Sequence, residues 1–197
     1  MNPPVWCIGI TGFNGAGKST VAEFLRTHYS VGYYEVRAFL EDERIRREMP
    51  EGRESLVYVA NDLREKHGPE HIMKSLSEKA ITIRGRTPFI IESVRCVGEV
   101  QYLAQEFGDK FALIGVDAPI EERHRRVMGR KNHTDSVGFR KFLEQETLEM
   151  EQRDPWKQNL RGCMELVREE FLVWNAGTES QLARDLRIIA RAMRLPC

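Results

Sequence analysis

The sequence predicts a three-layer α/β fold in which a five-stranded parallel sheet carries helices on both faces. Two observations lead to this fold. Five short apolar runs recur along the chain, and helical patterns separate them. The 197 residues are 41% hydrophobic and 30% charged, which suits a single domain, 1–197, with a core and a solvated surface. Strands that alternate with helices pair in parallel, so ligands are expected where the strands end.

The first strand is expected at residues 5–10, an apolar and partly β-branched run typical of a buried parallel strand. Directly after it, residues 12–19 read GFNGAGKS and match the phosphate-binding pattern G-x-x-x-x-G-K-[ST]. A helix follows, because apolar residues recur at helical spacing over residues 21–25. A strand, a glycine loop and a helix in this order predict a P-loop, and together with the sheet a P-loop NTPase fold.

The loop is expected to bind the phosphates of ATP together with Mg²⁺. Its glycines allow backbone N–H groups to point at phosphate oxygens. Lys18 would reach the β- and γ-phosphates as a catalytic residue, and the Ser19 hydroxyl would ligate the metal. The expected nucleotide-binding residues of the loop are Gly12, Asn14, Gly15, Ala16, Gly17, Lys18, Ser19 and Thr20.

A second strand is expected at residues 31–36, and a charged, mostly helical stretch, 37–84, follows it with a break at 68–69. Two arginines of this stretch are candidates for binding the phosphate of a second substrate. Arg37 is one because it ends the strand, and Arg64 is the other because it precedes the break beside the expected cleft. The other arginines of the stretch are expected to be solvated surface charges.

The third strand is expected at residues 88–94, and a helix follows at 97–107. Glu92, near the end of this strand, would be a second contact of Mg²⁺ and thereby a catalytic residue. Arg95 would point into the same cleft and bind a phosphate of the acceptor. Two plainer interpretations stay open, because the carboxylate could cap a loop and the arginine could belong to a structural ion pair.

The fourth strand is expected at residues 111–116, and Pro119 begins another helix. Arg123, Arg126 and Arg130 are spaced three and four residues apart on this helix and therefore share one face. Guanidinium groups so placed repel one another unless anions or carboxylates neutralise them. A transferring phosphoryl group is an anion that would do this. Arg126 and Arg130 are therefore candidate catalytic residues, with Arg126 also a nucleotide contact. The alternative is a surface on which glutamates neutralise the arginines.

Residues 132–160 are polar and carry no strand signal. A fifth strand is expected at 171–174, and a last amphipathic helix at 180–194. Between them, the turn that contains Asn175 and Gly177 could bring its backbone beside an adenine ring, so both residues are candidate nucleotide contacts.

The composition excludes several other classes of protein. Thirty basic and thirty acidic residues give a formal net charge of zero, which argues against a nucleic acid polymer as partner. The four cysteines, at positions 7, 96, 163 and 197, lack the spacing of a zinc site, and the five histidines show no metal spacing either. No apolar run is long enough to cross a membrane, and no secretory signal precedes the P-loop. A cytoplasmic protein is expected.

On these residues the chain resembles the nucleoside monophosphate kinase group of P-loop kinases, through Gly12, Gly15 and Gly17 of the tighter loop pattern and through the arginines that follow the strands. It is most similar to the deoxynucleoside monophosphate kinase and dephospho-CoA kinase branch, and to a family of archaeal kinase-like proteins. The resemblance implies that 37–84 binds the acceptor and that 126–160 is a mobile lid. It also implies that adenine lies near 175–178.

The resemblance implies an ATP- and Mg²⁺-dependent phosphotransferase that acts on a nucleoside or deoxynucleoside monophosphate. Dephospho-CoA is the alternative acceptor, although the acidic Asp-x-Asp-like element of that branch reads Glu35-Val36-Arg37 here. A nucleotide-sensing module that turns ATP over weakly is a further alternative. Transporter-type ATPases and GTPases are disfavoured, because the Leu-Ser-Gly-Gly-Gln and Asn-Lys-x-Asp motifs are missing.

Overall fold

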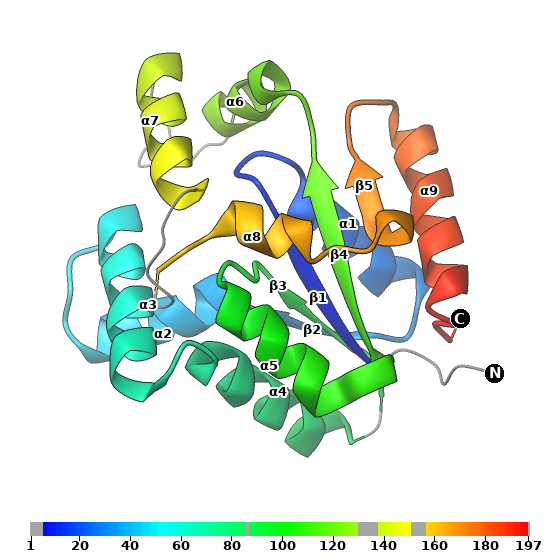
Figure 1. Ribbon diagram of the computed structural model, residues 1–197, viewed down its shortest axis with the longest axis horizontal. Coiled ribbons are helices and arrows are strands. Elements are labelled where there is room, and N and C mark those ends of the chain that lie inside the picture. The colour runs from blue at the N-terminus through cyan, green and yellow to red at the C-terminus, as the bar shows by residue number, and fades with distance from the viewer. Residues whose placement is uncertain (1–5, 86, 130–137, 151–156, 197) are drawn as a thin grey trace.

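The protein is described from a computed structural model that covers residues 6–85, 87–129, 138–150 and 157–196. Its five strands form one sheet in the order β2-β3-β1-β4-β5, and every neighbouring pair is parallel, as the sequence predicts. The P-loop strand β1 lies at the centre (Figure 1). The strands are β1 (Cys7–Gly12), β2 (Gly32–Glu35), β3 (Phe89–Glu92), β4 (Phe111–Asp117) and β5 (Leu172–Trp174).

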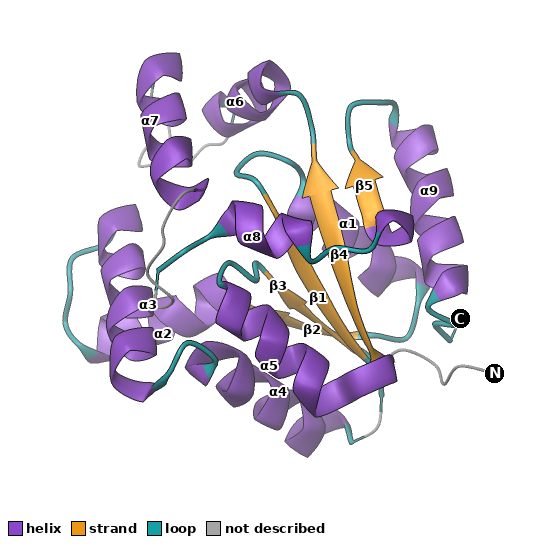
Figure 2. Cartoon of the chain, in the orientation of Figure 1, coloured by secondary structure: helices purple, strands orange, loops and turns teal. Residues whose placement is uncertain are grey.

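Helices cover both faces of this sheet, so the fold has three layers (Figure 2). Successive side chains of β1 point to opposite faces, with Ile8 and Ile10 in one buried cluster and Cys7 in the other. Both faces are therefore apolar, which explains why the strands read as continuous hydrophobic runs. The helices are α1 (Lys18–His28) and α9 (Glu179–Ala192) on one face, and α4 (His71–Arg84), α5 (Val97–Phe107) and α8 (Leu160–Glu165) on the other.

Two helical pairs extend beyond the ends of the strands. The pair that follows β2 consists of α2 (Val36–Arg46) and α3 (Arg53–His67), and the pair that follows β4 consists of α6 (Ile120–Met128) and α7 (Phe139–Met150) (Figure 1). The first pair is joined by an ion pair of 2.6 Å between a guanidinium nitrogen of Arg47 and a carboxylate oxygen of Asp62. Two short 3₁₀ turns, Gly108–Lys110 and Glu169–Phe171, precede β4 and β5.

Some expected boundaries are wrong. The second strand ends at Glu35, so Arg37 does not end a strand but lies in the first turn of α2. Val36 is only 3% exposed and joins Leu40 in the core one helical turn later, which explains why the helix begins there. The third strand ends at Glu92, because Ser93 has a φ of 75°, which an extended strand does not allow.

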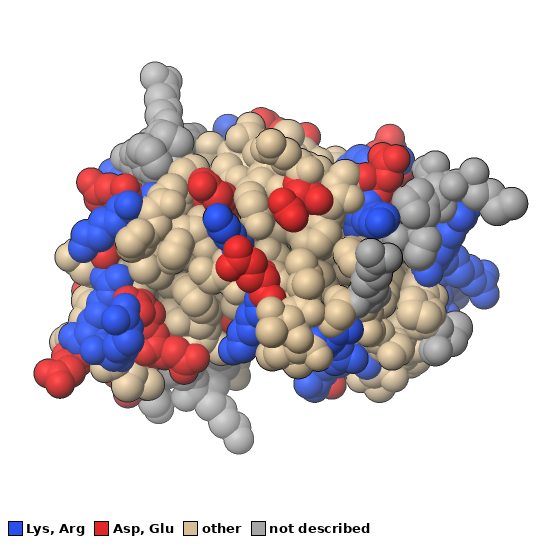
Figure 3. Space-filling view, turned by 90° about the horizontal axis from the view of Figure 1, so that it is seen from below, with Lys and Arg blue, Asp and Glu red and all other residues tan. Residues whose placement is uncertain are grey.

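Charges of both signs mix on the surface. Figure 3 shows acidic and basic side chains interspersed with uncharged ones on one face of the molecule. Many arginines pair with glutamates three or four residues away on the same helix, as Arg26 does with Glu23 and Arg46 with Glu43. None of the helices in the described part of the chain is long and apolar enough to cross a membrane.

Candidate functional site

The P-loop joins β1 to α1 along a path that only glycine can follow. Gly12, Gly15 and Gly17 have φ values of 139°, 81° and 101°, which side chains rarely tolerate. A Cβ atom on Gly12 would lie 2.0 Å from the carbonyl oxygen of Val116, and one on Gly15 would lie 2.3 Å from that of Arg123. The glycines therefore set both the backbone conformation and the close packing of the loop against β4 and α6.

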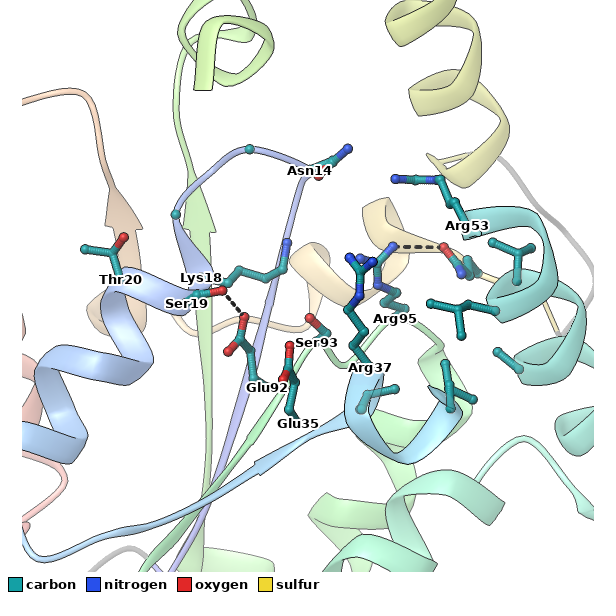
Figure 4. Close-up of a pocket in the computed structure, with 18 of the residues that line it drawn as sticks. Asn14, Lys18, Ser19, Thr20, Glu35, Arg37, Arg53, Glu92, Ser93 and Arg95 are labelled. Carbon is teal, nitrogen blue, oxygen red and sulfur yellow. Dashed lines mark hydrogen bonds between the residues drawn. The ribbon is translucent and has the colours of Figure 1, made fainter. Parts of the chain in front are cut away.

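Lys18 is the first residue of α1 and is only 8% exposed. Its ammonium group donates hydrogen bonds of 2.9 Å to the carbonyl oxygens of Gly12 and Phe13, so the side chain curls back over the loop. The same side chain borders the cavity in front of the loop (Figure 4). A cation is thus held where the phosphates of a bound nucleotide would lie.

Glu92 at the end of β3 is 3% exposed, and both of its carboxylate oxygens are engaged by side chains. Ser19 donates a hydrogen bond of 2.7 Å to Oε1, and the Tyr33 hydroxyl donates one of 2.5 Å to Oε2. Burial and the bond to Glu92 raise the pKa of Tyr33. The structure therefore brings together the two residues expected to meet Mg²⁺, and Glu92 does not cap a loop. Sequence reasoning missed Tyr33.

A second carboxylate stands beside the first, because Glu35 is the register partner of Glu92 on the neighbouring strand β2. Glu35 is half-buried and borders the cavity. Burial raises the pKa of its carboxyl group, the neighbouring Glu92 raises it further, and the charge of Arg37 opposes both effects. Glu35 was not among the expected site residues, although its place at the end of a strand could have indicated it.

One cavity of about 520 Å³ joins the P-loop to the helical pair that follows β2. Figure 4 shows charged side chains converging on it from the loop, from α2, from α3 and from the end of β3. Its loop side is lined by Asn14, Gly15, Gly17, Lys18, Ser19, Thr20, Glu92, Ser93 and Arg126. Its opposite side is lined by Glu35, Val36, Arg37, Leu40, Arg53, Leu56, Val57, Ala60, Arg64, Arg95 and Gln158.

Three arginines, each on a different element, line the side of the cavity that lies opposite the P-loop. Arg37 lies in the first turn of α2, Arg53 begins α3, and Arg95 follows β3 (Figure 4). A guanidinium nitrogen of Arg95 donates a hydrogen bond of 3.2 Å to Gln158. Arg37 and Arg95 were expected in this cleft. Arg53 was read as a surface charge, because its position depends on where α3 begins.

Arg64 also borders the cavity, as the sequence led us to expect, but its side chain is 1% exposed. Its Nε and Nη2 donate hydrogen bonds of 3.0 and 2.8 Å to one carboxylate oxygen of Glu99. Its Nη1 has no hydrogen-bond partner within the described residues. Arg64 is therefore a buried side chain that is paired with Glu99 and has one donor remaining.

Arg126 and Asn175 lie behind the P-loop and bind the same backbone carbonyl. Arg126 donates from Nη1 to Ala16 at 3.2 Å and from Nη2 to the carbonyl of Asn175 at 2.8 Å. The Asn175 amide donates to Ala16 at 2.8 Å. Helix α6, the loop and the turn after β5 are thereby fixed to one another. Asn175, Gly12, Ala16 and Gly177 are not among the residues that line the cavity.

Arg123, like Arg126 with Glu122, is paired with a glutamate, as the alternative interpretation of this helix expected. Its guanidinium is bound to the carboxylate of Glu146 in α7, with Nη2 3.1 Å from Oε2, and its Nε donates to the carbonyl of Ala118 at 2.9 Å. It also lies 5.0 Å from the ring centre of Phe13. Arg123 therefore joins α7 to the base of the loop. Arg130 lies outside the described residues.

Other metal-binding chemistry has no support in the described part of the chain, which holds no group of three or more histidine, cysteine or acidic residues arranged to bind an ion. Cys7, Cys96 and Cys163 are buried thiols. Burial raises the pKa of each of them, so these thiols are poor nucleophiles.

Residues 8–157 match a family model described as an AAA domain. A UPF0200/UPF0201 protein of Archaeoglobus fulgidus is 30% identical over 183 residues, which are 92% of this chain and 54% of the relative, so the chain spans about half the length of that protein. A UPF0200 protein of Methanothermobacter thermautotrophicus is 30% identical over 143 residues, which cover 73% of this chain and 71% of the relative.

Solved structures with the same architecture include kinases. A sugar kinase from a Janibacter species aligns over 98% of this chain and 99% of its own, with a TM-score of 0.55 and 18% identity. A shikimate kinase from Bacteroides thetaiotaomicron aligns over 96% and 99%, with a TM-score of 0.55 and 13% identity. At these identities the similarity concerns the fold, which is that of a P-loop kinase.

Proposed function

The chain belongs to the AAA domain family and to the UPF0200 proteins, and we propose that it is an ATP- and Mg²⁺-dependent phosphotransferase. Its acceptor is a small molecule that carries a phosphate, in the first place a nucleoside or deoxynucleoside monophosphate. One observation carries the proposal: a single cavity of about 520 Å³ has a P-loop on one side and several arginines on the other. A donor phosphate and an anionic acceptor can meet there.

The donor half would bind ATP in the manner of a P-loop. Lys18 faces the phosphates, and Arg126 would meet charge that develops on the transferring group from behind the loop. Asn175 and Gly177 belong to the turn proposed to lie near adenine. Arg130 is proposed as a second cation of this kind.

The residues at the P-loop fit a magnesium ion. The Ser19 hydroxyl and the buried carboxylate of Glu92 lie 2.7 Å apart, and both offer the oxygen ligands that Mg²⁺ prefers. Mg²⁺ bound there would neutralise charge on the β- and γ-phosphates. Tyr33 fixes the other oxygen of Glu92, so the carboxylate has one orientation toward the loop.

The acceptor half combines cations with an apolar surface. Arg37, Arg64 and Arg95 are proposed to bind the acceptor phosphate, and Arg53 joins them on the same side of the cavity. Val36, Leu40, Leu56, Val57 and Ala60 line the wall beside them and could bury an apolar ring. We accordingly assign acceptor binding to 37–84 and a lid-like role to 126–160, within one kinase domain.

An acceptor hydroxyl, as in dephospho-CoA, is the second candidate, and Glu35 favours it. A half-buried carboxylate whose pKa is raised stands beside Glu92 in the cavity, where it could accept the proton of a hydroxyl nucleophile. An acceptor phosphate needs no such base and would be repelled by it. The two candidates therefore predict opposite effects of Glu35→Gln, namely loss of turnover for a hydroxyl acceptor and retained turnover for a phosphate acceptor.

A coupled assay of ADP release tests the proposal. Nucleoside and deoxynucleoside monophosphates should raise the rate above the basal hydrolysis of ATP, and the matching nucleosides should not. Stimulation by dephospho-CoA alone would favour the second candidate. No stimulation by either kind of acceptor, with ATP bound, would indicate a nucleotide-sensing module instead.

A further inference from the structure

Glu99, in the first turn of α5, is completely buried and does not line the cavity. Its carboxylate nevertheless accepts four hydrogen bonds. Oε1 accepts from Nε and Nη2 of Arg64 at 3.0 and 2.8 Å, and Oε2 accepts from the backbone N–H groups of Arg95 and Cys96 at 2.9 and 3.0 Å. One carboxylate thus binds both the acceptor helix α3 and the loop that follows β3.

Helix capping accounts for only half of these contacts. Glu99 is the third residue of α5, and a side chain there that accepts a bond from the residue before the helix forms a capping box. That motif needs only Oε2. The other oxygen is used entirely by Arg64, which comes from a different helix 35 residues away in sequence.

Arg64 borders the cavity and keeps one guanidinium nitrogen that Glu99 does not bind. Two of its three guanidinium nitrogens are fixed on Glu99, and the group is planar, so the direction of the third nitrogen is fixed as well. This third nitrogen, Nη1, is buried and has no hydrogen-bond partner within the described residues, while Arg64 itself lines the cavity. A buried cationic donor without a partner is stabilised by an anion that reaches it.

Arg95 is positioned by the same carboxylate. Its backbone N–H is held by Oε2 of Glu99, its carbonyl accepts from Asn159 at 2.8 Å, and its side chain extends into the cavity (Figure 4). The two arginines therefore line one cavity and are held by the two carboxylate oxygens of Glu99. The geometry of each depends on a residue that a ligand in the cavity would never touch.

We propose that Glu99 is a positioning residue that makes Arg64 and Arg95 a single binding site for the anionic group of the acceptor. This inference rests on the proposed function, because it assigns the site to the acceptor of that reaction. Removing the carboxylate would free the guanidinium group of Arg64 and the backbone from which the Arg95 side chain extends. Acceptor binding would weaken, whereas the P-loop, which Glu99 does not contact, would keep its geometry.

Two variants and one matched control test the proposal in steady-state kinetics. The acceptor used is whichever nucleoside monophosphate stimulates the wild-type protein most. Glu99→Gln removes the charge, and Arg64→Lys keeps a cation opposite Glu99 but loses Nη1, the nitrogen that Glu99 does not bind. Each should raise the acceptor KM by about 10- to 100-fold, as expected for a lost charge-assisted contact, with kcat and the KM for ATP nearly unchanged. Glu106→Gln, an exposed glutamate on the same helix, should change none of these values.

The double variant Arg64→Lys/Glu99→Gln should raise the acceptor KM no more than the larger single change, because both act on one site. An unchanged acceptor KM in folded Glu99→Gln would overturn the proposal, and so would a fall in kcat alone. Removing one partner of a buried ion pair can unfold a protein. If Glu99→Gln does not fold, the proposal is tested with Arg64→Lys. An unchanged acceptor KM in that variant would overturn the proposal.

A binding measurement separates failure of this inference from failure of the proposed function. If no acceptor stimulates the wild-type protein, inorganic phosphate is titrated in the presence of Mg²⁺ and AMP-PNP, which fill the P-loop, and the thermal midpoint is followed. Phosphate should stabilise the wild-type protein and Glu106→Gln, but not Arg64→Lys. Equal stabilisation of all three proteins would overturn the anion site, whatever reaction the protein catalyses.

Discussion

At the scale of single residues, the site depends on side chains whose orientation is set by their neighbours. Glu92 receives bonds from Ser19 and Tyr33, and Arg64 receives its orientation from Glu99. The sequence could predict Ser19 and Glu92, because motif and strand end place them. It could not predict Tyr33 or Glu99, because neither belongs to a motif or ends a strand, and only the packing of the fold brings them to their partners.

Arg126 provides a direct test of the donor half. Arg126→Ala removes a cation that contacts the carbonyls of Ala16 and Asn175 beside the loop. We expect kcat to fall by about 10²-fold, as for the loss of other preorganised donors, with a smaller change in the KM for ATP. Arg125→Ala is the matched control, because Arg125 lies on the same helix and is 77% exposed. An effect on the KM for ATP alone would contradict a role in the transition state.

Glu35 makes the free energy of unfolding depend on pH, and its ionisation lowers that free energy. Its pKa in the folded protein is raised above the ordinary value of 4.5, so the folded state binds this proton more tightly than the unfolded state does. The ionised carboxylate therefore destabilises the fold, and this penalty grows as the pH rises through 4.5 and through the raised pKa.

Glu35→Gln should consequently raise the thermal midpoint at pH 7, and the difference from wild type should vanish as the pH falls below the ordinary carboxyl pKa. Differential scanning calorimetry at a series of pH values measures this difference in thermal midpoint. The effect should be modest, since the side chain is only partly buried. A variant that is less stable than wild type at pH 7 would show that Glu35 is held by a favourable contact instead.

At the scale of elements, strands were easier to predict than the helical pairs. The five apolar runs are continuous because both faces of the sheet are covered, and all five strands are found. The break at 68–69 is confirmed by the end of α3 at His67. The break between α2 and α3 was not predicted, although Pro50 and Gly52, with a φ of 141°, were visible signals within it.

Helix α7 provides a test at this scale, because a buried ion pair connects it to α6. The side chains of Arg123 and Glu146 are each 6% exposed. Glu146→Gln would leave a buried guanidinium without its main counter-charge, and we expect the free energy of unfolding to fall by about 3 kcal/mol. Urea denaturation measures this change. Glu144→Gln, on the same helix and paired with the exposed Arg140, should have little effect. Equal effects of both variants would mean that the buried pair does not hold α7.

At the scale of the whole molecule, the fold brings distant segments of the chain to one cavity. The P-loop, the start of α2, the face of α3 and the end of β3 all lie at the carboxyl edge of the sheet. Because ligands of parallel sheets bind at this edge, the sequence alone located Lys18, Glu92 and Arg95 at the cavity. It could not locate Arg53 or the apolar wall of α3, because those depend on how a helix packs beyond the sheet.

The central claim is that one cavity passes a phosphoryl group from ATP to an acceptor that already carries a phosphate. Incubation with ATP labelled at its γ-phosphate, with a panel of nucleoside monophosphates and their nucleosides, tests it most directly. The account predicts label in a nucleoside diphosphate, none in the products of nucleosides, and no transfer by folded Lys18→Ala. Label found only in inorganic phosphate, or only in a product of an unphosphorylated acceptor, would contradict it.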